Sequence, residues 1–302
     1  MSTGVAHTHD GAMDLPSGSP AQVETPQPGD PRLARLSLNQ ATVKYWSLFQ
    51  AVEGCLKAGL PAIGLWREPV AEVGLDRAAR MVRESGLRVS TYCRGGFLTG
   101  PDQQASLDDN RRAVDEAAEL GAPVLVMVVG GMPEGDRDLV AIRERMAESL
   151  AALVPYAAER GVQLGLEPLH PIFCADRAVL STLGQALDVA ERFTPEQVGV
   201  VVDAYHVWWD PQVWDHIARA GASGRISSFQ ACDWVLPLPA DPLLGRGMVG
   251  DGHADVGALR RAVDAAGYEG DIEVEIFNEQ LWRANGDEVI ATLARRHVQY
   301  VI

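Results

Sequence analysis

The chain alternates between short apolar runs and longer segments in which apolar residues recur every three or four positions. This alternation is typical of βα units around a parallel sheet. We predict eight strands, over residues 35–40, 62–67, 88–95, 123–130, 163–169, 198–206, 225–233 and 271–278. The segments between them predict amphipathic helices. In SLDDNRRAVDEAAELG, for example, Leu107, Val114 and Ala118 share one face.

Eight strands, each followed by a helix, predict an α/β fold of the (β/α)₈ TIM barrel type. The alternative is a doubly wound open sheet, which calls for a Gly-rich phosphate-binding turn after the first strand. RLSLNQATVKYW, which begins at Arg35, contains no such turn. We therefore expect a single barrel domain over residues 32–302, and a chain of 302 residues fits this size.

Residues 1–31 are rich in Pro, Gly, Ser and Thr and nearly lack large apolar side chains, which predicts a disordered, flexible tail. The chain starts without a basic stretch followed by an apolar core, and it contains no apolar run of membrane-spanning length. Its four cysteines are scattered without a CxxC pair, as expected for free thiols in a reducing compartment. These features predict a cytoplasmic protein.

The net charge of −15 and the pI near 4.8 argue against nucleic-acid and anionic-membrane partners. Candidate chemistry is found at the ends of the later strands, where functional side chains of such barrels lie. Glu167, Asp203 and Glu275 end apolar runs there, and Gln230 ends another. Buried carboxylates are costly unless they are paired, hydrogen-bonded or bound to a cation. Three of them at one end of a barrel predict an oxygen-rich site suited to Mn²⁺, with Mg²⁺ or Co²⁺ as alternatives.

Five motifs occur in order along the chain: LGLEPLHP, VVDAYHVWWDP, RISSFQACDW, GRGMVGDGHAD and IEVEIFN. Together they resemble the sugar phosphate isomerase/epimerase family of xylose isomerase-like TIM barrels, which includes tagatose/allulose 3-epimerases and inosose isomerases and dehydratases. The match covers residues 35–301. In that family Glu, Asp, His and Glu from strands five to eight hold one divalent ion. The resemblance implies Glu167, Asp203, Gln230 and Glu275 as the metal ligands here.

Gln230 departs from the family pattern, because a histidine usually holds the metal at this position. An amide oxygen is a hard ligand, so we expect a site that prefers Mn²⁺ or Mg²⁺ to Zn²⁺ and binds metal less tightly. Glu273 lies two residues before Glu275 on the same strand face, where we expect a buried ion pair.

The candidate substrate-binding residues stand at strand ends or in the loops after them: His206, Arg246, His170, Glu68, Arg94 and Trp208. The resemblance implies that His206 contacts metal-bound water or substrate and that Arg246 binds a substrate oxygen. The two residues from early strands, Glu68 and Arg94, are expected to select the substrate. His170 could contact substrate or pack in its loop, and Trp208 could stack on a sugar or fill an apolar space.

The function implied by the resemblance is that of a divalent-metal-dependent isomerase or epimerase of a keto-sugar or sugar phosphate. Glu167 and Glu275 would remove and return a proton next to the carbonyl through a metal-bound enediolate. The same intermediate could expel a leaving group, so a lyase or dehydratase acting on a keto-sugar, inosose or 3-keto-glycoside is an alternative. The sequence does not separate these outcomes, because they share the first step.

Two further classes of protein can be compared with the features of the sequence. A DNA-repair endonuclease with this barrel would need three metals and a basic face, which seven histidines and the acidic charge do not provide. A non-catalytic or partner-dependent barrel subunit is supported only by the substitution at Gln230. We expect a small-molecule sugar as partner, no nucleic acid, no membrane, and a homo-oligomer, dimer or tetramer, by resemblance.

Overall fold

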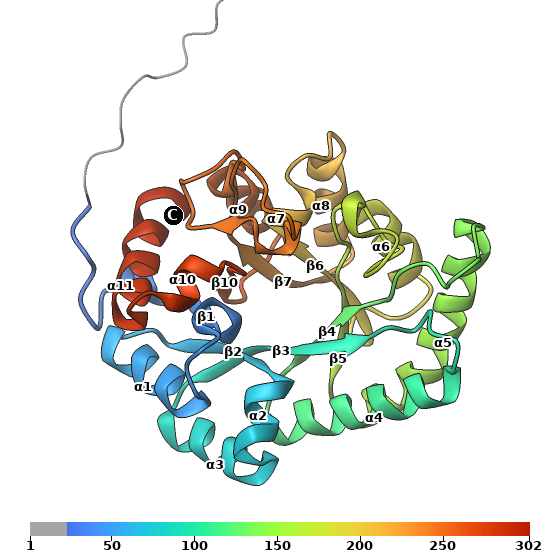
Figure 1. The fold of residues 1–302 in the computed structure, drawn as a ribbon, viewed down its shortest axis with the longest axis horizontal. Coiled ribbons are helices and arrows are strands. Elements are labelled where there is room, and N and C mark those ends of the chain that lie inside the picture. The colour runs from blue at the N-terminus through green and yellow to red at the C-terminus, as the bar shows by residue number, and fades with distance from the viewer. Residues whose placement is uncertain (1–22) are drawn as a thin grey trace, which may run out of the picture.

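A computed structural model describes residues 23–302 of the chain. Eight parallel strands form a closed barrel in the order β1-β10-β7-β6-β5-β4-β3-β2, so that neighbours in sequence are neighbours in the barrel (Figure 1). The strands are β1 (Leu36–Asn39), β2 (Ala62–Trp66), β3 (Arg88–Gly96), β4 (Val124–Val128), β5 (Gln163–Leu166), β6 (Val198–Asp203), β7 (Ile226–Ala231) and β10 (Ile272–Val274). Every one falls on a predicted strand, and the predicted TIM barrel is confirmed.

Helices surround the barrel and cover its outer face (Figure 1). They are α1 (Leu48–Ala58), α2 (Arg67–Val73), α3 (Leu75–Ser85), α4 (Gln103–Leu120), α5 (Leu139–Glu159), α6 (Leu183–Ala190), α7 (Ala204–Val207), α8 (Val213–Ala222), α9 (Val256–Ala265), α10 (Glu279–Arg283) and α11 (Gly286–Arg296). Helix α4 illustrates the local causes. Asp102 caps its start by accepting from Ala105 N, Leu107 and Val114 are buried, and Gly121 ends it with φ of 71°.

The predicted strands over 163–169 and 271–278 end earlier in the structure, at Leu166 and Val274. Apolar residues continue beyond these points, but the backbone leaves the ladder there to form the loops at the barrel mouth. Glu167 and Glu275 therefore stand just outside their strands. A short antiparallel pair, β8 (Asp233–Trp234) and β9 (Arg246–Gly247), was not predicted, since two-residue strands leave no periodic signal.

The predicted tail lies mainly outside the described residues, which begin at position 23. The described part, residues 23–31, runs beside α1 and α11 (Figure 1). Pro28 contacts the end of α1 so closely that a Cβ on Gly59 would lie 2.5 Å from its Cα. Within residues 23–302 no helix is both long and apolar enough to cross a bilayer.

His297, in the short π-helix His297–Val301, ties the end of the chain to its beginning. Its ring is 1% exposed, its Nε2 lies 3.2 Å from the carbonyl oxygen of Arg32, and burial lowers its pKa to about 4. The imidazole of His297 therefore binds a proton more readily in the unfolded chain than in the folded chain. Folding stability should therefore be lost as the pH falls from about 6.5 to 4, by on the order of 3 kcal/mol for this group.

His297→Gln is expected to make the free energy of unfolding less dependent on pH over this window. Urea unfolding at several pH values between 4 and 7 measures the effect. His253→Gln, which changes an exposed histidine, is the matched control and should keep the wild-type slope. An unaltered slope in His297→Gln would mean that the histidine is not responsible.

Candidate metal centre and active site

Four predicted ligands come from four adjacent strands at the carboxyl end of the barrel. Glu167 follows β5, Asp203 ends β6, Gln230 lies in β7 and Glu275 follows β10. None is more than 5% exposed. The barrel thus brings together residues that are up to 108 positions apart in the sequence (275 − 167 = 108).

One group of ligand atoms consists of Glu167, Asp203 and His206, whose donor atoms all lie within 4.8 Å of one another. His206 Nε2 lies 3.9 Å from Glu167 Oε1 and 3.8 Å from Asp203 Oδ2. Glu275 is not part of this group. It forms a second one with Cys93 and Glu273. The predicted ligands are therefore split between two neighbouring clusters of side chains.

Arg246, from β9, joins the two clusters. Its Nη1 donates to Asp203 Oδ2 at 3.0 Å, to Glu275 Oε2 at 2.8 Å and to the main-chain oxygen of Glu275 at 3.2 Å. The side chain is only 2% exposed. The guanidinium group is thus an internal cation between two of the three carboxylates, and it holds them in place.

The three carboxylates outnumber this single cation. Burial raises the pKa of Glu275 to about 8, with Arg246 opposing the shift, and burial together with Asp203 and Glu275 raises the pKa of Glu167 well above its usual range. The pKa of Asp203 is raised by burial as well, against the pull of Arg246. With all three ionised, Glu167, Asp203 and Glu275 would carry two negative charges more than Arg246 supplies, and Glu273 in the neighbouring cluster adds a further carboxylate, so a divalent cation would reduce the excess.

Two buried oxygens at this centre, Glu167 Oε1 and Gln230 Oε1, have no hydrogen-bond partner among the described residues. Unpartnered buried polar atoms are costly, so they indicate a missing ligand. Carboxylate and amide oxygens form a hard donor set. On charge, on donor type and on these free oxygens, the residues fit a divalent cation.

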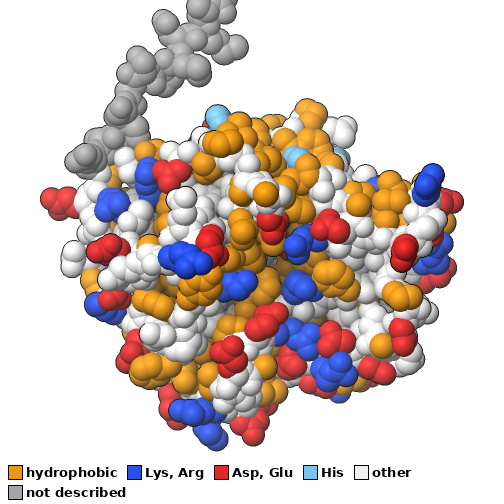
Figure 2. Space-filling model, in the orientation of Figure 1, with side chains coloured by type: hydrophobic (Ala, Val, Ile, Leu, Met, Phe, Trp, Pro, Cys, Tyr) orange, Lys and Arg blue, Asp and Glu red, His pale blue; other side chains and the backbone are white. Residues whose placement is uncertain are grey.

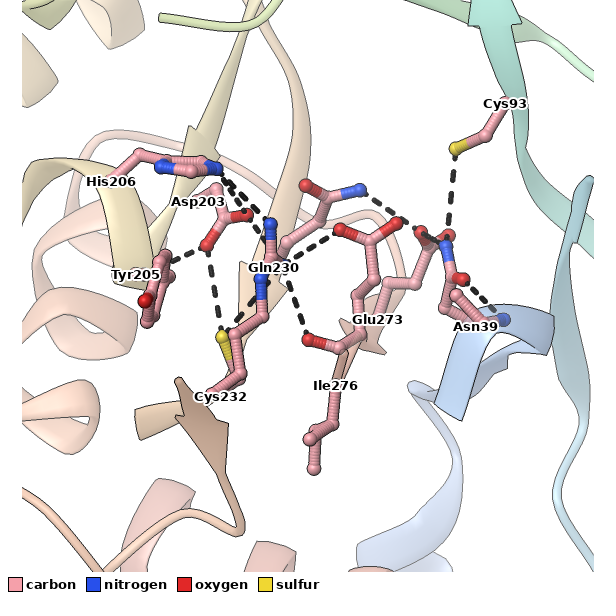
Figure 3. Close-up of polar contacts among 12 residues, drawn as sticks. Asn39, Cys93, Asp203, Tyr205, His206, Gln230, Cys232, Glu273 and Ile276 are labelled. Atoms are coloured by element: carbon pink, nitrogen blue, oxygen red, sulfur yellow. Dashed lines mark hydrogen bonds and ion pairs between the residues drawn. The ribbon is translucent and has the colours of Figure 1, made fainter. Parts of the chain in front are cut away.

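Gln230 is oriented by a polar layer below the centre. Its Nε2 donates to Glu273 Oε1 at 3.1 Å, and Glu273 also accepts from Asn39 Nδ2 at 2.7 Å, from Thr91 Oγ1 and from Ser90 Oγ. Figure 3 shows Gln230 and Asn39 on either side of Glu273. All these donors are neutral and no cation lies within 4.0 Å of Glu273 in residues 23–302, so the expected ion pair is wrong. Because the amide nitrogen is engaged, the amide oxygen of Gln230 is the atom left free.

His206 is held as a neutral hydrogen-bond donor. Its Nδ1 accepts from the main-chain N–H of His170 at 3.1 Å, which assigns the ring proton to Nε2. Burial first and then Arg246 lower the pKa of His206 well below its usual value. Nε2 lies 3.1 Å from Arg246 Nη2. In this tautomer both nitrogens are donors, so they do not hydrogen-bond to each other and both lack an acceptor at this contact. An oxygen atom beside the pair, at hydrogen-bond distance from each nitrogen, would accept from both.

A cavity of about 460 Å³ opens above these residues. Its base includes Glu167, His206, Arg246 and Glu275, and Arg94 from β3 lines its wall. Figure 2 shows the hollow near the centre of this face, with Lys and Arg side chains around it. Three aromatic residues that the sequence did not single out, Trp66, Phe277 and Trp282, also line it. Trp66 is the last residue but one of the predicted strand 62–67, so the expectation of functional residues at strand ends could have included it.

The structure places three other candidates outside this cavity. Glu68, in the first turn of α2, lines a neighbouring cavity of about 490 Å³. His170 Nδ1 accepts from Ile172 N, and its ring packs on Trp234 with centroids 4.7 Å apart. Trp208 also packs on Trp234, at 5.9 Å. For His170 and Trp208 the geometry therefore favours loop packing over substrate contact.

The sequence profile described as "Xylose isomerase-like TIM barrel" matches residues 49–297. The chain belongs to the xylose isomerase-like TIM barrel family. The resemblance seen in the five motifs is thereby confirmed at the level of the family.

Solved structures of other members of this fold superpose on the barrel. The crystal structure of protein SMc04130 from Sinorhizobium meliloti 1021 is 48% identical, with a TM-score of 0.86 over 89% of this chain and 99% of that one. The IolI protein, solved with a binding zinc atom, is 20% identical, with a TM-score of 0.76 over 88% and 98%. L-ribulose 3-epimerase is 20% identical, with a TM-score of 0.70 over 87% and 93%. No curated protein matches the sequence.

Proposed function

We propose that this xylose isomerase-like barrel is a divalent-metal-dependent isomerase or epimerase of a keto-sugar or sugar phosphate. One observation carries the proposal: three buried carboxylates, an amide oxygen and a single guanidinium meet at the base of a cavity, with two oxygens unpartnered. The fold is shared with L-ribulose 3-epimerase and with the zinc-binding IolI protein, which adds support for an enzyme that holds a metal.

Glu167, Asp203, Gln230 and Glu275 would hold the ion, which when bound polarises the substrate carbonyl and acidifies the neighbouring C–H bond. Because the free oxygen of Gln230 replaces a histidine nitrogen, Mn²⁺ or Mg²⁺ suits the site better than Zn²⁺.

Glu167 and Glu275 are the proposed proton carriers. The ionised carboxylate removes the proton from the carbon next to the carbonyl, and the electron pair of the C–H bond shifts towards the carbonyl oxygen. The other, protonated carboxylate returns a proton to the opposite face in an epimerisation or to the neighbouring carbon in an isomerisation. Burial raises the pKa of Glu275 to about 8 and raises the pKa of Glu167 above its usual range, so each side chain binds a proton more tightly than a solvent-exposed glutamate does.

The negative charge that develops on the substrate oxygen needs donors. The N–H groups of His206 Nε2 and Arg246 Nη2, whose nitrogens lie 3.1 Å apart, are suited to this role, because the neutral imidazole donates without itself adding a charge. The same proton removal would begin an elimination, so lyase and dehydratase activities remain the alternative chemistry for this site.

Proton exchange with solvent tests the proposal whatever the final product. We expect the Mn²⁺-loaded protein, incubated in heavy water with a panel of ketoses, ketose phosphates and inososes, to place deuterium next to the carbonyl of the accepted compound. Mass spectrometry of recovered substrate and product measures the exchange and also detects a lost leaving group. A chelator should abolish it. Full metal occupancy without exchange in any compound would refute the proposal.

The Gln230→His variant is expected to keep the fold and to bind Zn²⁺ about tenfold more tightly, because an imidazole nitrogen is the softer ligand. Glu273→Gln replaces one carboxylate oxygen by an NH₂ donor among the side chains that donate to Glu273, which disturbs the orientation of the Gln230 amide and should weaken Mn²⁺ binding about tenfold. Competition with a chromophoric chelator measures both affinities. Unaltered metal binding in both variants would mean that Gln230 does not contact the metal.

A further inference from the structure

Three cationic side chains line the same cavity above the carboxylates: Lys44, Arg94 and Arg177. They come from different parts of the barrel mouth. Lys44 follows the 3-10 helix Gln40–Val43, Arg94 lies in β3, and Arg177 lies in the loop after β5. This gathering stands out in a chain whose net charge is −15. Figure 2 shows Lys and Arg side chains around the central hollow.

These cations lack the carboxylate partners that comparable arginines have. Within residues 23–302, no carboxylate lies within 4.0 Å of Lys44 or Arg94, whereas half-buried Arg67 pairs with both Asp109 and Glu116. The Lys44 ammonium lies over the Trp282 ring at 4.6 Å, and the Arg94 guanidinium stacks on a phenylalanine ring at 4.3 Å. Both contacts leave polar hydrogens available.

Arg177 has a single weak partner. Its Nε lies 3.6 Å from the carboxylate of its own neighbour, Asp176, and makes no hydrogen bond among the described residues. Burial lowers the pKa of Arg94; Glu68 opposes this effect and the positive charge of Arg177 adds to it. The two guanidinium groups therefore repel each other in a partly dehydrated wall, an arrangement that an anion between them would stabilise.

Acidic groups near the mouth do not remove this excess. Glu68 lies beyond 4.0 Å from Arg94, and the carboxylate of Asp241, which lines the cavity, accepts from Leu243 N at 3.0 Å. The carboxylates of the base are opposed locally by Arg246 and, on the proposed function, by a divalent ion. With that ion bound, Arg177 would keep only its weak contact with Asp176, and Lys44 and Arg94 would have no carboxylate within 4.0 Å among the described residues.

We propose that Arg94, Arg177 and Lys44 form a subsite for the phosphate group of a phosphorylated sugar, whose carbonyl end lies over the carboxylates. This inference rests on the proposed function for the orientation of the sugar. The binding of phosphate itself does not depend on it. Two guanidinium groups and an ammonium supply three positive charges to face a phosphate dianion, and arginine recognises phosphate oxygens in a bidentate manner.

Calorimetric titration with inorganic phosphate and with a ketose and its phosphate ester, on the Mn²⁺-loaded protein, tests the subsite. We expect inorganic phosphate to bind and the ester to bind more tightly than the neutral ketose. Arg94→Met and Arg177→Met should each weaken the binding of both phosphates at least about tenfold, while Arg94→Lys should weaken it less. Arg80→Met, which changes an exposed arginine on α3, is the matched control and should bind phosphate as the wild type does.

Several outcomes would overturn the subsite. These are binding that is equal in all variants, ester binding no tighter than that of the ketose, and a preference for a sugar carboxylate over the phosphate. Circular dichroism of each variant separates a lost contact from a lost fold. Deuterium exchange on neutral ketoses without phosphate binding would refute the subsite alone. Phosphate binding that responds to Arg94 and Arg177 without any exchange would refute the proposed enzymatic function alone.

Discussion

The Glu167→Gln variant is expected to lose solvent-proton exchange on one of the two epimers by at least about 100-fold, because an amide can neither accept nor return the substrate proton. Glu167 lies buried at the cavity base with one oxygen unpartnered. If Glu167 and Glu275 serve opposite faces of the substrate, Glu275→Gln should fail on the epimer that Glu167→Gln still deprotonates. Deuterium incorporation into each of the two epimers, followed separately, measures this pattern.

Metal occupancy must be measured alongside exchange, since both glutamates are also proposed ligands. Glu116→Gln is the matched control: it removes a half-buried glutamate, paired with Arg67, that lies outside the cavity base. This control should keep wild-type exchange. Exchange that persists in both Glu167→Gln and Glu275→Gln would show that neither residue carries the proton.

The Arg246→Met variant is expected to lose about 3–5 kcal/mol of folding stability in the presence of a chelator, because Asp203 and Glu275 are left buried without their cation. If the same carboxylates hold a divalent ion, adding Mn²⁺ should restore a large part of this loss. Arg246→Lys keeps the charge but not the planar fork, so its loss should be smaller. Urea unfolding of both variants, each with and without Mn²⁺, measures these changes in the free energy of unfolding.

A buried arginine elsewhere provides the control for this experiment. Arg225 is 6% exposed and donates to the carbonyl oxygens of Ala190, Val198 and Phe193, and no carboxylate of residues 23–302 lies within 4.0 Å of it. Arg225→Met should therefore also destabilise the protein, but Mn²⁺ should not rescue it. If Mn²⁺ fails to rescue Arg246→Met as well, the guanidinium group is the cation of this centre and the metal proposal fails.

Much of the barrel could be predicted from the chain because each unit carries its own local signals. The apolar runs locate all eight strands, and Gly121 marks the end of a helix. The rule that strand ends carry function also located Glu167, Asp203, Gln230 and Glu275 at one end of the barrel. A position at a strand end does not show which cavity a side chain lines, however, because Glu68 lines the cavity next to the one above the carboxylates.

Side-chain contacts within the centre could not be read from the sequence. Arg246 was expected to bind substrate, yet it also bridges Asp203 and Glu275, because the β8–β9 pair turns its side chain inward. Glu273 was expected to pair with a cation, but its carboxylate instead accepts hydrogen bonds from neutral side chains on three other strands. Such contacts depend on side-chain rotamers and on the paths of loops, and the periodic pattern of apolar residues predicts neither.

The sequence by itself determined the barrel, the family and the four polar residues at adjacent strand ends, because strand period, helix ends and strand order are local or sequential properties. The orientation of the Gln230 side chain, in contrast, becomes clear only from the folded structure. Its amide nitrogen is engaged by Glu273, and its oxygen is left unpartnered near the carboxylates. The orientation of the Gln230 amide depends on hydrogen-bond partners from distant strands and on the burial of several carboxylates together. Both conditions arise only when the barrel closes.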